Sequence, residues 1–248
     1  MKISTLIGLV ASALFLAGCH TLTNPVSTSH VSAKPYTESA ALTIYEAHPL
    51  KGSEKVSVHA YSYTRGSDHC YRTIALKSNS NHLILGDGKP DSPIMLIGEA
   101  PSAIEDESGK TFQGEVGTLL DKMLLAIEIK RDSIYLSYAI NFRPPEDRKP
   151  TSQEIKRYSI FLKKHISIID PKLIIVMGSS AMEALTGSGN KISKERGNWK
   201  EIILDNKTYP MMISFNPSYL IRFPENKKYS WEDLKKIRDK IKELKIKL

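Results

Sequence analysis

The chain has 248 residues, which suits one good-sized domain plus an extension and would leave two full domains cramped. Its hydrophobic content of 41% and charged content of 25% are those of an ordinary globular protein. The net charge of +8 and the isoelectric point near 9.3 favour a polyanionic partner, although a surface of solvated lysines gives the same values. Two cysteines, Cys19 and Cys70, are too few for a disulfide framework or a cysteine-built metal site.

The first residues are typical of an export signal. Lys2 precedes an apolar stretch that has no acidic residue and ends in Leu-Ala-Gly-Cys at residues 16–19. The stretch is too short to span a bilayer, and small residues at its end are typical of a cleaved secretory signal. The ending resembles the cleavage box of bacterial lipoproteins, which implies a signal peptide at residues 1–18, lipidation of Cys19 and a membrane anchor in the cell envelope. A buried first helix is the alternative.

Residues 19–75 are expected to be a tether or a fused segment with little structure. From residue 20 onward this part of the chain is rich in Ser, Thr, Ala, His and Tyr and shows no sustained periodicity. Only residues 55–63 alternate well enough to predict a strand. The composition changes near residue 75, and Ile and Lys dominate residues 76–248, which we expect to form the main domain.

Strand and helix patterns alternate along residues 76–248. Apolar runs predict strands at residues 93–98, 133–140, 172–178 and 209–215. Helical patterns occupy residues 117–127, 151–169, 179–187 and 230–248. Thr151 with Glu154 has capping-box spacing, and Ser230 with Asp233 predicts a similar start for the last helix. Continuous apolar strands separated by helices predict an α/β fold with a parallel sheet covered on both faces.

The unusual loops all follow predicted strands, where ligand sites of such sheets lie. Residues 98–117 gather carboxylates that suit a metal, a general base or a developing cation, or simply a solvated loop. Residues 141–150 contain prolines, which stiffen the backbone, and arginines, which can bind phosphates. The alternative is a rigid turn with charges on the surface. Residues 216–224 place apolar side chains beside Arg222, as a wedge for a base stack or as a loop folded back on the core.

Together these loops resemble the uracil-DNA glycosylase superfamily, in its family-four bacterial type. The stretch GEAPSAIEDESGKTFQGEVGTLLDKML is similar to the family's first motif, RPPEDRKP to its Arg-Pro-Pro segment and NPSYLIR to its His-Pro-x-Tyr-Leu-Leu-Arg loop. PKLIIVMGSSAMEAL and KERGNW are similar to segments between them. The resemblance covers about residues 76–245. It implies a three-layer αβα sandwich with a four-stranded parallel sheet, and a monomeric enzyme of DNA base-excision repair that hydrolyses the N-glycosidic bond of uracil.

The resemblance also implies a role for each site residue. Cleavage of the bond between uracil N1 and the sugar builds positive charge on the sugar and negative charge on uracil O2, after the base has been flipped out. Glu99, Glu105 and Asp106 would act on the water and sugar side, with Asn216 at uracil O2. Phe112 would stack on the base, and Tyr138 stands where the base edge is recognised. The residues implied to contact DNA are Arg143, Arg148, Tyr219, Leu220, Ile221 and Arg222.

The chain departs from the family pattern at both base-contacting positions. Tyr138 stands where the family has Asn, and a tyrosine is bulkier and has one hydroxyl instead of a donor and an acceptor. Asn141, three residues on, is not favoured as a substitute. Asn216 stands where the family has His, although its amide still donates a hydrogen bond. These changes predict impaired excision; the alternative is a catalytically inactive nucleic-acid-binding domain or envelope lipoprotein from a fused or degenerate gene.

The resemblance raises two further conflicts. Many family members hold a four-iron cluster on four cysteines, but Phe142 and Tyr158 stand at two of those positions and the other pair falls near Arg72 and Ala75. We therefore expect no cysteine-ligated cluster and no other metal. DNA repair implies a cytoplasmic enzyme, whereas residues 1–19 predict export. A fused reading frame, a downstream start and action in the envelope on another ligand all remain open, and we favour the fused or degenerate gene.

Overall fold

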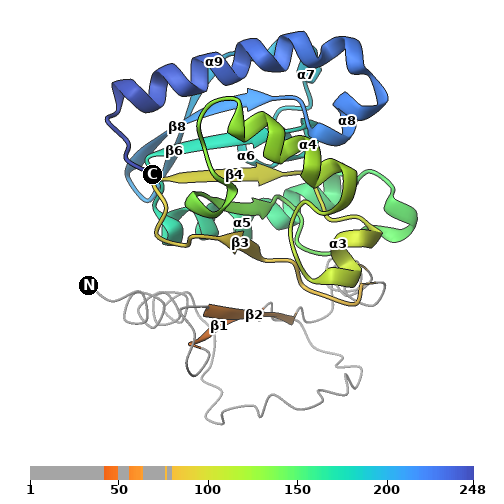
Figure 1. The fold of residues 1–248 in the computed structure, drawn as a ribbon. Helices are drawn as coiled ribbons and strands as arrows, with labels where there is room; N and C mark the ends of the chain where they lie inside the picture. The colour runs from red at the N-terminus through yellow and green to blue at the C-terminus, as the bar shows by residue number, and fades with distance from the viewer. Residues whose placement is uncertain (1–41, 50–55, 64–75, 77–79) are drawn as a thin grey trace. The chain divides into compact units, whose positions relative to one another are not determined.

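The computed structural model describes residues 42–49, 56–63, 76 and 80–248 (Figure 1). The chain divides into two compact units, Met1–Ala75 and Leu76–Leu248. The segment 1–18 and both cysteines lie outside the described residues, so the expected signal, the lipidation of Cys19 and the register of Cys70 are not tested. No helix in the described part of the chain is long and apolar enough to cross a membrane.

The described residues of the first unit form a two-stranded antiparallel sheet. Strand β1 (Leu42–Pro49) pairs with β2 (Val56–Tyr63), so that Leu42 lies opposite Tyr63. Strand β2 confirms the strand predicted at residues 55–63. Strand β1 was not expected from the sequence, because its apolar alternation stops at Glu46.

The second unit is built on a six-stranded sheet with the order β3-β5-β4-β6-β8-β7 (Figure 1). Its centre consists of four parallel strands: β5 (Tyr135–Tyr138), β4 (Ile94–Gly98), β6 (Leu173–Met177) and β8 (Lys207–Ser214). These strands confirm the predicted four-stranded parallel sheet. Strands β3 (Gly86–Gly88) and β7 (Trp199–Leu204) add antiparallel edges that we did not predict, because β3 is very short and β7 exposes half of its side chains.

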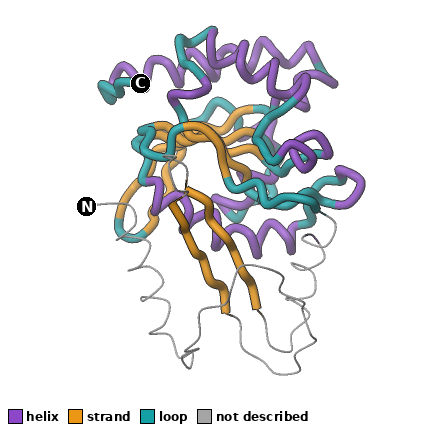
Figure 2. The backbone as a smooth tube through the Cα atoms, turned by 60° about the horizontal axis from the view of Figure 1, so that its bottom comes forward, coloured by secondary structure: helices purple, strands orange, loops and turns teal. Residues whose placement is uncertain are grey.

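Helices cover both faces of this sheet, as the tube in Figure 2 shows. Successive strand residues point to opposite faces, so Met95 and Ile97 belong to one buried cluster and Leu96 to the other. The first cluster includes helices α5 (Ser152–Ile169) and α6 (Ser179–Thr186). The second includes α4 (Gly114–Leu125) and α9 (Lys227–Glu243). The expected three-layer αβα sandwich is therefore confirmed.

Shorter elements shape the loops at the carboxyl ends of the strands. Helix α3 (Ala103–Ser108) lies within the acid-rich loop, and α8 (Pro217–Arg222) follows β8. Helix α7 (Ile192–Glu195) and three 3-10 turns, at Arg131–Ser133, Pro145–Asp147 and Pro224–Asn226, complete the unit.

Two predicted helix starts had different outcomes. Thr151 and Glu154 form a capping box at the start of α5, which confirms that prediction. The prediction for the last helix is wrong. Helix α9 begins three residues earlier, at Lys227, and Ser230 and Asp233 lie inside it with buried side chains. Asp233 instead pairs with Arg196 and accepts a hydrogen bond of 2.8 Å from the Ser214 hydroxyl.

Candidate active site

The carboxylate of Glu99, directly after β4, joins three strand ends. Its Oε1 accepts hydrogen bonds from the Ser180 backbone N–H at 2.9 Å and from the Ser179 hydroxyl at 3.2 Å, where β6 leads into α6. Its Oε2 accepts a hydrogen bond from Asn216 Nδ2, beyond β8, at 3.1 Å. A carboxylate has about four lone-pair positions. Because these three donors use three of them, one position remains for a water molecule or a sugar on the half-buried side chain.

Gly178 makes room for this carboxylate. Its φ of +106° lies in a region that side chains rarely adopt. A Cβ atom at this position would lie 2.3 Å from Glu99 Cδ and 2.6 Å from Glu99 Oε2. A glycine at the end of β6 is thus a requirement for the position of Glu99, and it connects the Gly-Ser-Ser stretch to the site.

Asn216 is held by its neighbours in one orientation. Its Oδ1 accepts a hydrogen bond from the Ser218 N–H at 3.0 Å and so caps helix α8. The amide nitrogen must then face Glu99, to which it donates one of its two hydrogens. The second N–H is left for an acceptor in the site. Asn216 and Glu99, which lie 117 residues apart in the sequence, therefore form a connected donor–acceptor pair.

Glu105 and Asp106 do not join this pair. Glu105 is buried in the capping box of α3, where it accepts hydrogen bonds from the Ser102 N–H at 2.9 Å and the Gln113 N–H at 2.8 Å. Asp106 is buried against residues 81 and 82, whose backbone N–H groups donate to Oδ1 at 2.8 and 3.0 Å. Glu105 thus joins Ser102 and Gln113 within the acid-rich loop, and Asp106 ties that loop to residues 81 and 82.

Phe112 and Tyr138 form a buried aromatic pair. Their ring centroids lie 4.8 Å apart, and their side chains are 2% and 3% exposed. The Phe112 N–H donates to the Tyr138 hydroxyl at 2.8 Å, while Arg131 donates to the Phe112 carbonyl at 3.1 Å. These contacts hold Phe112 at a φ of +44°, an unusual conformation for a bulky residue. The ring expected to stack on a base therefore packs against the Tyr138 ring, with the two planes tilted by 34°.

The environment of Tyr138 keeps its hydroxyl protonated. Burial raises its pKa well above the usual range, and the charge of Glu105 adds to the rise. Gly98 lies against the aromatic pair, since a Cβ there would be 2.6 Å from the Phe112 ring and 2.9 Å from the Tyr138 ring. Asn141 does not compensate for the missing amide, because its Nδ2 donates to the Ile84 carbonyl at 3.0 Å.

The two arginines of loop 141–150 are paired with carboxylates. Arg143 Nε donates to Asp147 at 2.7 Å. Arg148 makes a two-pronged contact with Glu154, at 2.9 and 2.7 Å, and this contact lowers the pKa of Glu154 to about 2. Arg148 thereby ties the loop to the first turn of α5, and a DNA phosphate would have to compete with that pair.

In the loop after β8, the side chains that were predicted to contact DNA differ in their exposure to solvent. Leu220 is 1% exposed and belongs to the core cluster under α4 and α9, so it is not available as a wedge in this structure. Ile221 is half-buried and Arg222 is exposed. Tyr219 stacks between Phe215 and Phe223, at centroid distances of 4.8 Å on each side.

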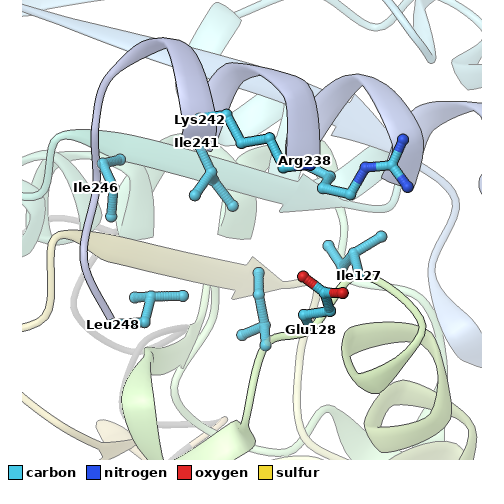
Figure 3. Close-up of a pocket in the computed structure, with 8 residues that line it drawn as sticks. Ile127, Glu128, Arg238, Ile241, Lys242, Ile246 and Leu248 are labelled. Carbon is cyan, nitrogen blue, oxygen red and sulfur yellow. The ribbon is translucent and has the colours of Figure 1, made fainter.

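A groove of about 270 Å³ lies elsewhere, between the end of α4 and the end of α9 (Figure 3). Apolar side chains such as Ile127 and Ile241 line it, with Glu128 and Arg238 among them. None of the site residues predicted from the sequence lines this groove.

Comparison with known proteins identifies the family. The model of the Uracil DNA glycosylase superfamily matches residues 85–237, more than half of the chain. The chain belongs to that superfamily. It is 34% identical over 170 residues to the type-4 uracil-DNA glycosylase of Thermotoga maritima, a match that spans 67% of this chain and 87% of the relative. The type-4 enzymes of Sulfurisphaera tokodaii and Archaeoglobus fulgidus are 34% and 27% identical, over 62% and 68% of this chain and 72% and 86% of theirs.

Membership of the superfamily agrees with the resemblance of the loop motifs and with the fold. Gly178 and Ser180 were not expected as partners of Glu99, although the glycine directly after an apolar strand was a usable signal. Arg131 was not expected either, since it lies outside every motif, and it supports Phe112. The Arg196–Gly197 turn was noted as a family feature, and the structure shows that it anchors α9 through Asp233.

Proposed function

We propose that this chain is a DNA-repair glycosylase that removes uracil from DNA by hydrolysing the bond between uracil N1 and deoxyribose. The observation that supports this most directly is the Glu99–Asn216 pair, because it places a carboxylate and an N–H donor together where the four parallel strands end. The relatives named above are type-4 uracil-DNA glycosylases, and they match this chain over the same unit.

The two members of the pair have complementary roles in the proposed reaction. As the bond breaks, positive charge grows on the sugar, and the Glu99 carboxylate stabilises it and orients the attacking water. Negative charge grows on uracil O2, and the remaining N–H of Asn216 donates to it. Ser179 and Ser180 act through Glu99 by fixing its orientation. Glu105 and Asp106 hold the loop, so that Glu99 is the carboxylate at the reacting centre.

The proposed reaction needs no iron–sulfur cluster. A cluster on four cysteines does not fit this chain, which has two cysteines in all. At two of the corresponding positions, Phe142 and Tyr158 pack in the hydrophobic core beside α6, and Tyr158 stacks edge-on against Phe161 at 6.2 Å. Aromatic side chains thus occupy positions at which the resemblance implies thiolate ligands.

A second candidate function is DNA binding without excision, and the Phe112–Tyr138 pair favours it. A flipped uracil would need the ring face of Phe112 that Tyr138 covers. A chain in which Tyr138 never moves aside would bind DNA and leave uracil in place.

The remaining parts of the proposal concern the rest of the chain. We propose residues 76–248 as a monomeric glycosylase domain that acts on cytoplasmic DNA, and residues 19–75 as a tether or fused segment. The alternative proposal is that residues 1–18 are a signal peptide and that Cys19 is lipidated, which would make the protein an envelope lipoprotein. Palmitate labelling of the full chain in a bacterial host tests it, and a well-expressed, unlabelled product would rule it out.

Excision by the full-length chain tests the proposed function. A fluorescent single-stranded oligonucleotide with one uracil is incubated with the protein, and alkali then breaks the strand at each abasic site. The proposal predicts cleavage by the wild type that is reduced at least about 100-fold in Glu99→Gln. A thymine in place of uracil is the substrate control. Binding of the oligonucleotide without cleavage would support the second candidate.

A further inference from the structure

Three aromatic rings form a continuous stack from the core to the surface, which we call the aromatic column. Phe215 is buried directly after β8, Tyr219 lies on α8, and Phe223 follows that helix. The centroids of successive rings are 4.8 Å apart, with interplanar angles of 26° and 38°. The spacing of four residues places the three rings above one another, as side chains one helical turn apart do. The column ends in the Phe223 ring, which is 44% exposed.

Neighbouring groups hold the column in place. The amide nitrogen of Asn226 donates to the Tyr219 hydroxyl at 3.3 Å. The guanidinium of Arg196 lies 6.0 Å from the centroid of the Phe215 ring and is itself paired with the buried carboxylate of Asp233. The Phe223 N–H donates to the Tyr219 carbonyl at 2.9 Å, which fixes the backbone that carries the exposed ring. A ring that is already ordered loses little conformational entropy when it binds a ligand.

The surface around the exposed ring is positively charged. Residues 222–229 contain Arg222, Lys227 and Lys228 and one carboxylate, Glu225. The three cations are exposed, and none of them is in an ion pair within the described part of the chain. An exposed aromatic ring next to cations is the combination that binds single-stranded nucleic acid, since bases stack on the ring and phosphates meet the cations.

We propose that Phe223 is a stacking site for an unpaired base of single-stranded DNA that flanks the target nucleotide, with Arg222 and Lys228 near the adjacent phosphates. The inference rests on the proposed function for its choice of DNA as the ligand. It replaces Leu220, which is buried, with a residue whose ring is exposed and braced. A stacking contact of this kind tolerates any base, because every base has a π face.

The experiment measures DNA binding separately from excision. The full-length chain is titrated into a fluorescein-labelled oligothymidine that contains no uracil, and anisotropy gives Kd. Phe223→Ala and Phe223→Leu should each weaken binding on the order of ten-fold, whereas Phe223→Trp should bind at least as well as the wild type. Ile203→Ala is the matched control, since Ile203 is an apolar side chain on edge strand β7 and is 72% exposed. It should leave Kd unchanged.

The leucine variant decides the mechanism. Wild-type affinity of Phe223→Leu together with weak binding of Phe223→Ala would overturn stacking and indicate an apolar wedge. Unchanged affinity of Phe223→Ala would overturn any contact of this ring with DNA. Arg222→Ala should reduce the slope of log Kd against log salt by about one ion or less. Because the probe contains no uracil, a wild type that fails to excise uracil can still give these results. Failure of the stacking proposal can therefore be distinguished from failure of the proposed excision.

Discussion

Replacing Tyr138 with Asn should make the chain a faster glycosylase and a less stable protein. In the wild type a flipped base must displace the Tyr138 ring from Phe112. Their stacking is worth about 1 kcal/mol, and the hydrogen bond between the Phe112 N–H and the Tyr138 hydroxyl about 1 kcal/mol more. Displacement therefore costs about 2 kcal/mol, which slows excision about 30-fold. Asn removes this cost and also supplies a donor and an acceptor for the base edge.

Tyr138→Phe is the matched control for this prediction. It keeps the ring on Phe112 and removes only the hydroxyl, so its gain should stay within about 5-fold, the share of the hydrogen bond. Tyr138→Asn should unfold about 3–5 kcal/mol more easily, since it empties a buried site. The assay is single-turnover cleavage of a uracil-containing single strand, at a temperature at which circular dichroism shows both variants folded. A Tyr138→Asn rate at or below that of Tyr138→Phe would refute the idea that the ring obstructs the base site.

Three other predictions concern the support of the site and the stability of the domain. Gly178→Ala should lower excision at least about 100-fold by displacing Glu99. Its control is Gly187→Ala, where the glycine also has a positive φ of +70° but a Cβ would meet nothing within 4 Å; this variant should lose about 1–3 kcal/mol of stability and keep its activity. Equal activity losses in the two variants would contradict the role of Gly178. Burial lowers the pKa of His165 to about 4, whereas in the unfolded chain this side chain takes up a proton at about pH 6.5. The free energy of unfolding therefore falls as the pH drops from about 6.5 to 4. Urea unfolding of His165→Gln should show a flatter pH dependence in that window, and an unchanged slope would contradict this effect. Arg148→Ala should reduce stability by about 0.5–1 kcal/mol above pH 4.5, where Glu154 is ionised, because the Arg148 side chain is 40% exposed and solvent screens the ion pair. It should leave the salt slope of DNA binding unchanged, because Glu154 holds the guanidinium, and a smaller slope would indicate a phosphate contact.

Periodicity was sufficient to predict the four central strands of the sheet. The strands that became β4, β5, β6 and β8 are continuous apolar runs, and such runs are typical of strands buried on both faces. The edge strands were not predicted, because they lack such continuous apolar runs. β7 alternates only weakly and is half exposed, and its pairing with β8 depends on a turn at Asp205 and Asn206, whose φ values are both positive.

The site was predictable only in part, because the sequence of the acid-rich loop does not show which groups each carboxylate contacts. Glu99 follows a core strand directly, and its carboxylate accepts hydrogen bonds from residues at the ends of two other strands. Glu105 and Asp106 lie in a helix too short to show a periodic pattern, and only their hydrogen-bond partners show that Glu105 holds the loop and Asp106 joins it to Asn81. Leu220 and Ile221 likewise looked equivalent in the sequence, and the direction of α8 decided which one is buried.

Release of free uracil is the measurement that tests the central claim most directly. Full-length wild type and Glu99→Gln are incubated with a single strand that carries one uracil among thymines, and the bases set free are identified by mass spectrometry. The account predicts that the wild type releases uracil, approaching one equivalent per strand, with no thymine, and that Glu99→Gln releases at least about 100-fold less. Wild-type release no greater than that of Glu99→Gln would contradict the claim.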